Sequence, residues 1–153
     1  SEFQQVAPTK FYRENEKLIY RFINENLIFA YDNQQILSLN SAYVLIPRLQ
    51  GYSIKYILAI LNSRPAQFFH AFSFFSVKVL RKHIESIPIP KCDEDQQITL
   101  VTMVNNLMSS NNLERRLFIY EEIDRIIMDL YAFSTEQRNL ITARFAQVKF
   151  LSR

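Results

Sequence analysis

The sequence predicts an α+β fold, in which a small antiparallel or mixed sheet packs against helices and leads into a C-terminal helical region. Residues that favour strands gather between positions 18 and 46, whereas apolar residues from position 54 onward recur at helical spacing. An Ile-Pro-Ile-Pro run at residues 87–90 separates the two parts. Because 153 residues can bury one core, we expect a single domain over 1–153, with a mixed α/β part at 1–90 and a helical part at 91–153.

The strand region covers residues 18–46. Its segments LIYRFI, NLIFAYD and ILSLNSAYVLIP are rich in β-branched and aromatic residues, so they predict three or four antiparallel strands that end at Pro47. Asp32 and Asn33 are typical turn residues, and we expect a hairpin corner there.

Two helices are expected next. Ser53 can cap a helix that ends near Asn62, since the apolar residues between them follow helical spacing. Pro65 suits the first turn of a second helix, PAQFFHAFSFF. His70 lies among the phenylalanines of that segment, and we expect it to be a partly buried packing side chain rather than a catalytic one.

The segment VKVLRKHIESIPIP, residues 77–90, predicts another extended stretch. Pro88 and Pro90 favour extended geometry in the residues before them and have no backbone N–H to donate. This end therefore cannot lie inside a paired sheet. We interpret the segment as a strand followed by a stiff exit corner.

The remaining chain predicts three helices. The carboxylates of Asp93, Glu94 and Asp95 complement the dipole at the start of the first, QQITLVTMVNNLMSS. The segment NNLERRLFIYEEIDRIIMDLYAF predicts the second helix. Ser134 and Gln137 form a capping-box pattern that opens the third.

Composition excludes several classes of site. A single Gly excludes a phosphate-binding loop and a dinucleotide fingerprint, which need several glycines. The lone Cys92 cannot form an intramolecular disulfide, and it is not spaced with the two histidines as a zinc site requires, so we expect a reducing, cytoplasmic location. No apolar run is long enough to span a membrane, and no signal peptide is visible. The chain begins at Ser1 without methionine, so we expect a piece of a longer protein.

Positive charge concentrates in the first part of the chain. Residues 1–90 contain ten Lys and Arg against six Asp and Glu, a net charge of +4, and residues 91–153 contain eight against nine, a net charge of −1, which together give the +3 of the whole chain. No acidic residue occurs between positions 33 and 84, where six bases fall: Arg48, Lys55, Arg64, Lys78, Arg81 and Lys82. This asymmetry suggests a surface that faces a polyanion, and the alternative is that the six are ordinary solvated side chains.

No catalytic arrangement is visible in the sequence. Its two carboxylate clusters, at residues 93–95 and 121–124, fall on helical surfaces or ends, where we expect capping and solvation rather than acid–base chemistry. A Ser/His/Asp, Cys/His or metal-nuclease pattern is also missing. We expect that the chain by itself is not an enzyme and holds neither a cofactor nor a metal.

The order of four segments resembles a known family. LIYRFINENLIFAYDNQQILSLNSAYVLIP, YSIKYILAILNSRPAQFF, LRKHIESIPIP and EIDRIIMDLYAFSTEQRNLI follow one another as in the TaqI-like C-terminal specificity domain. This is the target recognition domain of type II (IIG/IIS-like) restriction-modification enzymes that methylate adenine. The segment ESIPIP before a helix is also similar to specificity subunits of type I systems. One departure is that the loop before the Ile-Pro-Ile-Pro run has no glycine.

The resemblance implies a bacterial-type parent enzyme. Its methyltransferase domain, outside these residues, would bind S-adenosylmethionine and methylate adenine at N6 in double-stranded DNA, with the base flipped out of the helix. A nuclease domain would use Mg²⁺. In that parent, this chain would be the non-catalytic domain that reads DNA, supported by its helices.

Seven residues are candidates for DNA binding, because phosphate and base contacts need basic and polar side chains. Arg21 is included because the resemblance implies a basic residue on the first strand. Asn40, Gln50 and Asn62 lie near these residues in sequence and could add base contacts. The seven candidates are Arg21, Arg48, Tyr52, Lys55, Lys78, Arg81 and Lys82.

A second interpretation is a protein-interaction module. In that case the C-terminal helices would dock a partner chain, as in a fragment of a type I specificity subunit that assembles modification subunits. The basic region would then be incidental.

Overall fold

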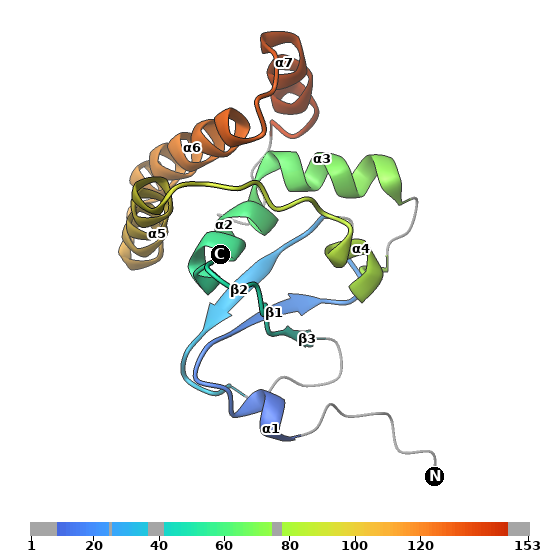
Figure 1. Cartoon of the computed structure of the whole chain (residues 1–153), viewed down its shortest axis with the longest axis vertical. Helices are drawn as coiled ribbons and strands as arrows, with labels where there is room; N and C mark the ends of the chain where they lie inside the picture. The colour runs from blue at the N-terminus through green and yellow to red at the C-terminus, as the bar shows by residue number, and fades with distance from the viewer. Residues whose placement is uncertain (1–8, 25, 37–41, 75–77, 147–153) are drawn as a thin grey trace.

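The computed structural model describes residues 9–24, 26–36, 42–74 and 78–146, and Figure 1 shows how their elements are arranged. Within these ranges there are three strands and seven helices, which confirms the predicted α+β fold. In chain order they are α1 (Thr9–Tyr12), β1 (Lys17–Arg21), β2 (Phe29–Asp32), β3 (Ala42–Leu45), α2 (Ile54–Asn62), α3 (Arg64–Ser73), α4 (Arg81–Glu85), α5 (Glu94–Ser109), α6 (Leu113–Leu130) and α7 (Thr135–Arg144).

The sheet is antiparallel, with β1 between β2 and β3. Because β2 and β3 lie on opposite sides of β1, the hairpin corner predicted at Asp32 and Asn33 is wrong. The outermost pairs of the register, with the β1 residue given first, are Lys17 with Asp32 and Tyr20 with Phe29 toward β2, and Leu18 with Leu45 and Arg21 with Ala42 toward β3.

Asp32 ends β2 in a different way from a hairpin. Its carboxylate accepts hydrogen bonds from the backbone N–H groups of Gln34 (2.8 Å) and Ile36 (2.9 Å) and pairs with the buried ammonium of Lys17. Burial opposes ionisation of Asp32, but the hydrogen bonds from Lys17, Gln34 and Ile36 outweigh it and lower the pKa of this carboxyl below its usual value. The pair therefore fixes the β1–β2 register at the end away from the loop that connects the two strands.

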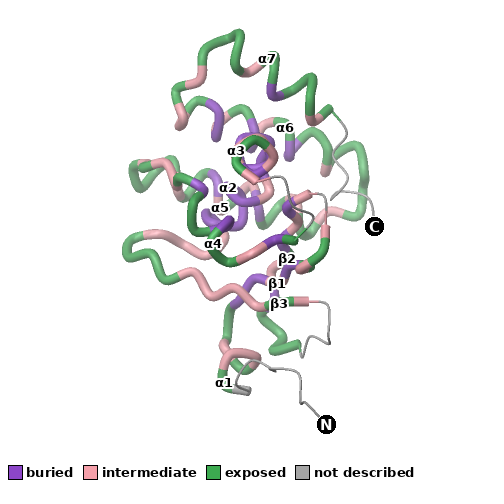
Figure 2. The backbone as a smooth tube through the Cα atoms, turned by 90° about the vertical axis from the view of Figure 1, so that its right-hand side faces the viewer, coloured by how far each residue is buried: buried purple, intermediate pink, exposed green. Residues whose placement is uncertain are grey.

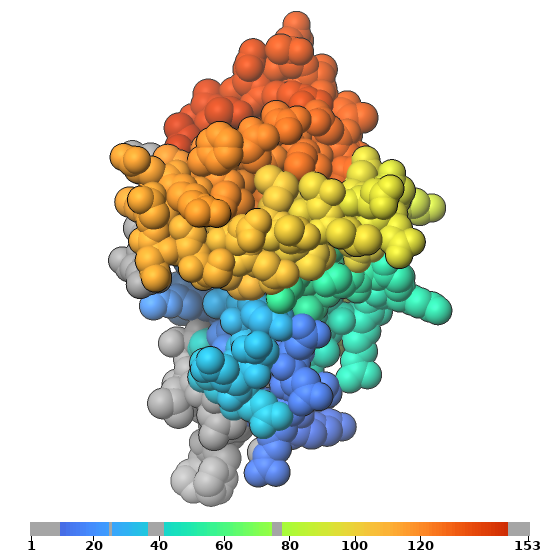
Figure 3. All heavy atoms as spheres, turned by 90° about the vertical axis from the view of Figure 1, so that its left-hand side faces the viewer, coloured from blue at the N-terminus to red at the C-terminus, as the bar shows by residue number. Residues whose placement is uncertain are grey.

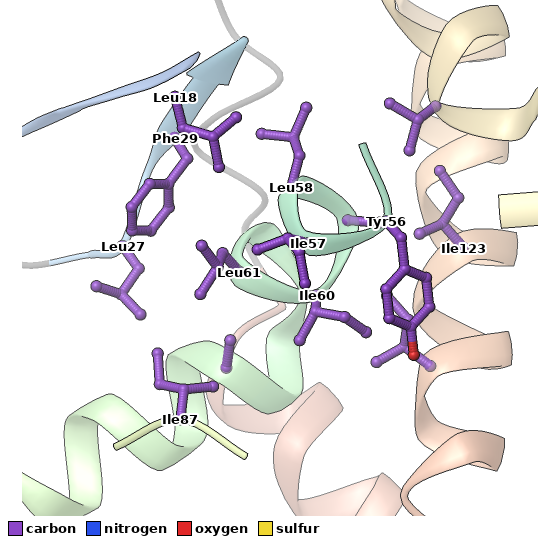
Figure 4. Close-up of a cluster of buried hydrophobic side chains, with 14 of the residues drawn as sticks. Leu18, Leu27, Phe29, Tyr56, Ile57, Leu58, Ile60, Leu61, Ile87 and Ile123 are labelled. Carbon is purple, nitrogen blue, oxygen red and sulfur yellow. The ribbon is translucent and has the colours of Figure 1, made fainter. Parts of the chain in front are cut away.

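One face of the sheet lies against α2. Side chains alternate along β1, so that Leu18 and Tyr20 are buried while Arg21 is exposed. Figure 4 shows Leu18 and Phe29 of the sheet in the same buried cluster as Leu58 of α2. Arg21 is thus directed away from the core.

The helix α2 lies at the centre of the core. Residues 56–61 are all buried, because the sheet, α3 and α5 surround this helix (Figure 4). The Ser53 hydroxyl caps it by accepting from the N–H of Lys55 at 3.2 Å, and it ends at Asn62. Both predicted ends of this helix are confirmed.

Ser63 joins α2 to α3. Its hydroxyl donates to the carbonyl of Ile60 at 2.6 Å and accepts from the N–H of Ala66 at 3.3 Å, so one side chain ends the first helix and caps the second. Pro65 lies in the first turn of α3 and His70 is buried, as predicted.

The segment predicted to be a strand at residues 77–90 contains a helix instead. α4 spans Arg81–Glu85, with His83 and Ile84 buried and Arg81 exposed and paired with Glu85 one turn later. An exposed-exposed-buried-buried pattern suits a helical turn and not the alternation of a strand. The extended prediction is therefore wrong for residues 81–85, although Pro88 and Pro90 do lead out of the segment without sheet pairing among the described residues.

Three longer helices follow, as predicted. Asp93 caps α5 and Ser134 caps α7. In each case the cap side chain accepts from the N–H of the Gln three residues later, and the side chain of that Gln accepts from the N–H of the cap residue. Helix α7 is largely exposed, with Ile141 as its buried residue (Figure 2). Helix α5 buries Leu100 and Val104, whereas Ile98 near its start is 56% exposed.

A buried guanidinium connects α3 to the C-terminal helices. Arg64 is 3% exposed and binds Glu121 through both terminal nitrogens (2.8 Å each) and Asp124 through Nη1 (3.1 Å). Its backbone N–H also donates to Asp124 (2.8 Å), and its Nε donates to the carbonyl of Phe145 (2.9 Å). Three segments therefore meet at one side chain: the start of α3, α6 and the residue that follows α7.

This network corrects the solvation role predicted for the acidic cluster at residues 121–124. Asp124 is 2% exposed, and burial raises its pKa to about 6, so its carboxylate is ionised at neutral pH. Burial also opposes the charge of Arg64, but the hydrogen bonds that it donates to Glu121 and the charge of Asp124 raise the pKa of the guanidinium above its usual value. Both members of the Arg64–Asp124 pair are therefore charged inside the protein.

We expect Arg64→Met to lower the free energy of unfolding by about 3–5 kcal/mol, because it leaves Asp124 buried without its cation. The matched control is Arg138→Met, which breaks the partly exposed pair with Asp129 and is expected to cost less than about 1 kcal/mol. Urea unfolding followed by circular dichroism measures both. Equal losses for the two variants would contradict the role given to Arg64.

Candidate nucleic-acid interface

Four of the seven candidate residues gather near the end of β1. Arg21 is the last residue of this strand, and Lys78 forms an antiparallel bridge with Ile23, two residues further on. The N–H of Val79 donates to the carbonyl of Phe22 at 2.7 Å, which holds the two segments together. Val79 points into the core, whereas Arg21 and Lys78 are exposed.

The helix α4 adds two more basic side chains beside Arg21 and Lys78. Figure 1 shows α4 next to the end of β1. Arg81 and Lys82 are exposed on the outer side of α4, and Val79 and Ile87 anchor the flanking chain in the core. We call the exposed side chains of Arg21, Lys78, Arg81 and Lys82 the basic surface.

Arg81 is a highly exposed cation of the basic surface. Its side chain is 84% exposed, and its Nε donates to the carboxylate of Glu85 at 2.6 Å. This hydrogen bond raises the pKa of Arg81 above its usual value. Burial raises the pKa of Tyr20 on β1, and the charge of Arg81 opposes that rise, which places Arg81 within electrostatic reach of β1.

The other three candidates lie elsewhere. Arg48 is near Glu14 (3.8 Å) and follows β3, so it is at the opposite end of β1 from Arg21. Lys55 donates to Asn105 of α5 at 2.6 Å and lies over the ring of Tyr31. Tyr52 is half-buried and stacks on Tyr56, with ring centroids 5.4 Å apart.

Asn62 is not available to contact a base. Its amide oxygen accepts from the N–H of Phe29 and its amide nitrogen donates to the carbonyl of Phe29, both at 2.9 Å. Gln67 does the same for Leu27, at 2.8 and 2.7 Å. Two side-chain amides thus close the outer edge of β2, which would otherwise expose unpaired backbone groups. Gln50 is exposed, and Asn40 lies outside the described residues.

Three rings pack behind the basic surface. The ring of His83 stacks on Phe74, with centroids 3.9 Å apart, and lies 5.8 Å from the ring of His70. Both histidines are buried, and Nε2 of His70 has no hydrogen-bond partner among the described residues. Burial and the neighbouring His83 lower the pKa of His70 below its usual value. His83 was not among the residues that the sequence predicted for the site. The available signal was its position in the first turn of α4, three residues after Leu80, which precedes the helix.

Two kinds of feature are not found in the ranges that the structure describes. No group of three or more His, Cys, Asp or Glu side chains there could hold a metal ion. A search of the same ranges finds no helix that is both long and apolar enough to cross a membrane. The geometry defines an α+β module that exposes basic side chains around one end of its central strand.

The comparison with protein families agrees with this class. The family model of the TaqI-like C-terminal specificity domain matches residues 1–89, more than half of the chain. The protein therefore belongs to this family, whose domains serve DNA recognition in restriction-modification enzymes. The curated proteins contain no match to the chain. The matched range includes the whole basic surface and ends before α5.

We expect Asn62→Ala to lower the free energy of unfolding by about 2–4 kcal/mol, because both backbone groups of Phe29 lose their partner at the edge of the sheet. Asn139→Ala is the matched control, since Asn139 is an exposed helical residue on α7, and no loss is expected there. Thermal unfolding of both variants tests this. If Asn62→Ala were as stable as Asn139→Ala, the closing role of the amide would be wrong.

Proposed function

We propose that the basic surface binds duplex DNA and that the domain positions the duplex for adenine-N6 methylation, with or without cleavage, by other domains of the same parent chain. The observation that supports this most directly is the gathering of Arg21, Lys78, Arg81 and Lys82 around one end of β1, inside the range that matches the family. Exposed bases suit phosphate oxygens, and an Arg can also read guanine.

The division of labour follows from what this chain contains. Its own residues would bind and orient the duplex, while a methyltransferase domain would hold S-adenosylmethionine and a nuclease domain would use Mg²⁺. The domain itself would be non-catalytic and would act in the cytoplasm. Val79 and Ile87 flank α4 and are buried in the core, so they fix both ends of this helix. A rigid support for the basic side chains of Arg81 and Lys82 suits this role.

A second candidate function is docking of a partner protein by the C-terminal helices. The helices α5 and α6 form a continuous band on one face of the molecule, as Figure 3 shows, and they lie outside the family match. Large apolar side chains are exposed on them: Ile98, Met108, Leu113, Leu117 and Phe118. Light scattering would support this candidate if it found a tight complex that Phe118→Ser disrupts without changing DNA binding.

We expect Arg81→Ala combined with Lys82→Ala to weaken binding of duplex DNA by about tenfold or more at low salt, and to reduce the slope of log affinity against log salt by about two. Loss of two phosphate contacts has this effect because fewer counterions are released. Fluorescence anisotropy over a salt series measures both quantities.

The matched control is Arg115→Ala combined with Arg125→Ala, which removes two exposed bases from α6. It is expected to change the affinity by less than about threefold, because these bases lie outside the basic surface. DNA binding that does not depend on salt, or equal losses in the two double variants, would refute the proposed surface.

Replacing Glu85 should have the opposite effect. Glu85→Gln removes the carboxylate that pairs with Arg81, so we expect DNA to bind about threefold to tenfold more tightly at low salt. The same anisotropy assay tests it, with Glu114→Gln on α6 as the control. Weaker binding by Glu85→Gln would show that Arg81 does not face the duplex.

A further inference from the structure

Three helices of this protein begin with the same type of bond. At α5 the side chain of Gln96 accepts from the N–H of the cap residue Asp93 (3.0 Å), and at α7 Gln137 accepts from the N–H of Ser134 (2.8 Å). At α4 the corresponding acceptor is an imidazole, since Nδ1 of His83 accepts from the N–H of Leu80 (3.3 Å). Among these three helices, the one that presents Arg81 and Lys82 is therefore the one in which a titratable group accepts from the N–H of the cap residue.

The position of His83 links this bond to the core. Its ring is 3% exposed and is covered by Phe74 on one side, with His70 at its edge. Leu80 has no side-chain oxygen, so α4 lacks the second cap bond that Asp93 and Ser134 provide for α5 and α7. The first turn of α4 depends on His83 more than the other two helices depend on their glutamines.

We propose that His83 is a positioning residue for the basic surface, and that protonation of its imidazole loosens the first turn of α4 and displaces Arg81 and Lys82. The effect on α4 follows from the geometry alone. The effect on DNA binding rests on the proposed function.

Protonation would act in two ways. An imidazolium carries hydrogen on both ring nitrogens, so Nδ1 could no longer accept from the N–H of Leu80. The new charge would also be buried against His70, which has no partner for its own Nε2. Both changes favour a state in which His83 leaves its site and α4 opens.

Among the described residues, no carboxylate is recorded in contact with the His83 ring, so none would compensate the charge of its imidazolium. The titratable group that faces His83 from α3 is His70, and β1 contributes Tyr20 near α4. On α4 itself, Arg81 and Glu85 are exposed and paired with each other, and Lys82 is exposed. The charged groups around His83 thus offer it no buried counter-ion in the part of the chain that the structure describes.

Nuclear magnetic resonance of the whole chain tests the effect on α4. Lowering the pH from about 7.5 to about 5.5 should reduce the hydrogen-exchange protection of the Ile84 and Ser86 amides by about fivefold, the size of a lost helix cap. His83→Gln, which copies the acceptor of α5 and α7, should abolish that reduction. His70→Phe keeps the bond to Leu80 and should retain it.

DNA binding by the same proteins gives the second measurement. At constant salt, added positive charge alone would tighten binding to a duplex as the pH falls. Displacement of α4 instead predicts that the affinity of the unchanged protein falls about fivefold relative to His83→Gln over the same pH range.

Each outcome decides a separate point. A His83 ring that titrates without any change in α4, a ring that stays neutral throughout, or a pH response retained in His83→Gln would overturn the positioning role. If α4 responds as described but no duplex binds at any pH, the positioning role stands and the proposed function fails. If binding is salt-sensitive but its pH ratio is the same in both proteins, the proposed function stands and the inference fails.

Discussion

The guanidinium of Arg64 lies where the family-matched part of the chain meets its helices, and the arrangement of the two parts depends on its contacts. It begins α3, pairs with Glu121 and Asp124 on α6, and donates to the carbonyl of Phe145 beyond α7. A charge that is 3% exposed is stable only while its partners stay in place, so the geometry of these segments is tightly specified. Because α3 follows α2 after a single residue, Ser63, the same contact fixes the helix at the centre of the core.

Local signals predicted much of this fold. The caps at Ser53, Asp93 and Ser134 act within three residues of the chain, so they were visible in the sequence and are confirmed. What sequence could not predict are the contacts between distant segments. The strand order β2–β1–β3 and the pair between Arg64 and Asp124, 60 residues apart, depend on tertiary packing that no local pattern encodes.

The candidate site shows the same division between local and distant information. The absence of acidic residues from position 33 to position 84 drew attention to this part of the chain, and three of its candidates, Lys78, Arg81 and Lys82, lie together near Arg21. The same pattern could not show that Arg64 and Asn62 are committed to the core and to the edge of the sheet. Composition reports which side chains are present, whereas burial and pairing decide which of them remain able to meet a ligand.

The central claim is that duplex DNA meets this domain at the end of β1 and at α4. It is tested most directly by adding a short duplex to the ¹⁵N-labelled chain at low and at high salt and following the backbone amide signals. We expect shifts at residues 21–23 and 78–86 that disappear as salt rises. Basic side chains that contact phosphates release counterions from the DNA, so the affinity falls with added salt. Shifts confined to α5, α6 and α7, or shifts that do not depend on salt, would contradict the account.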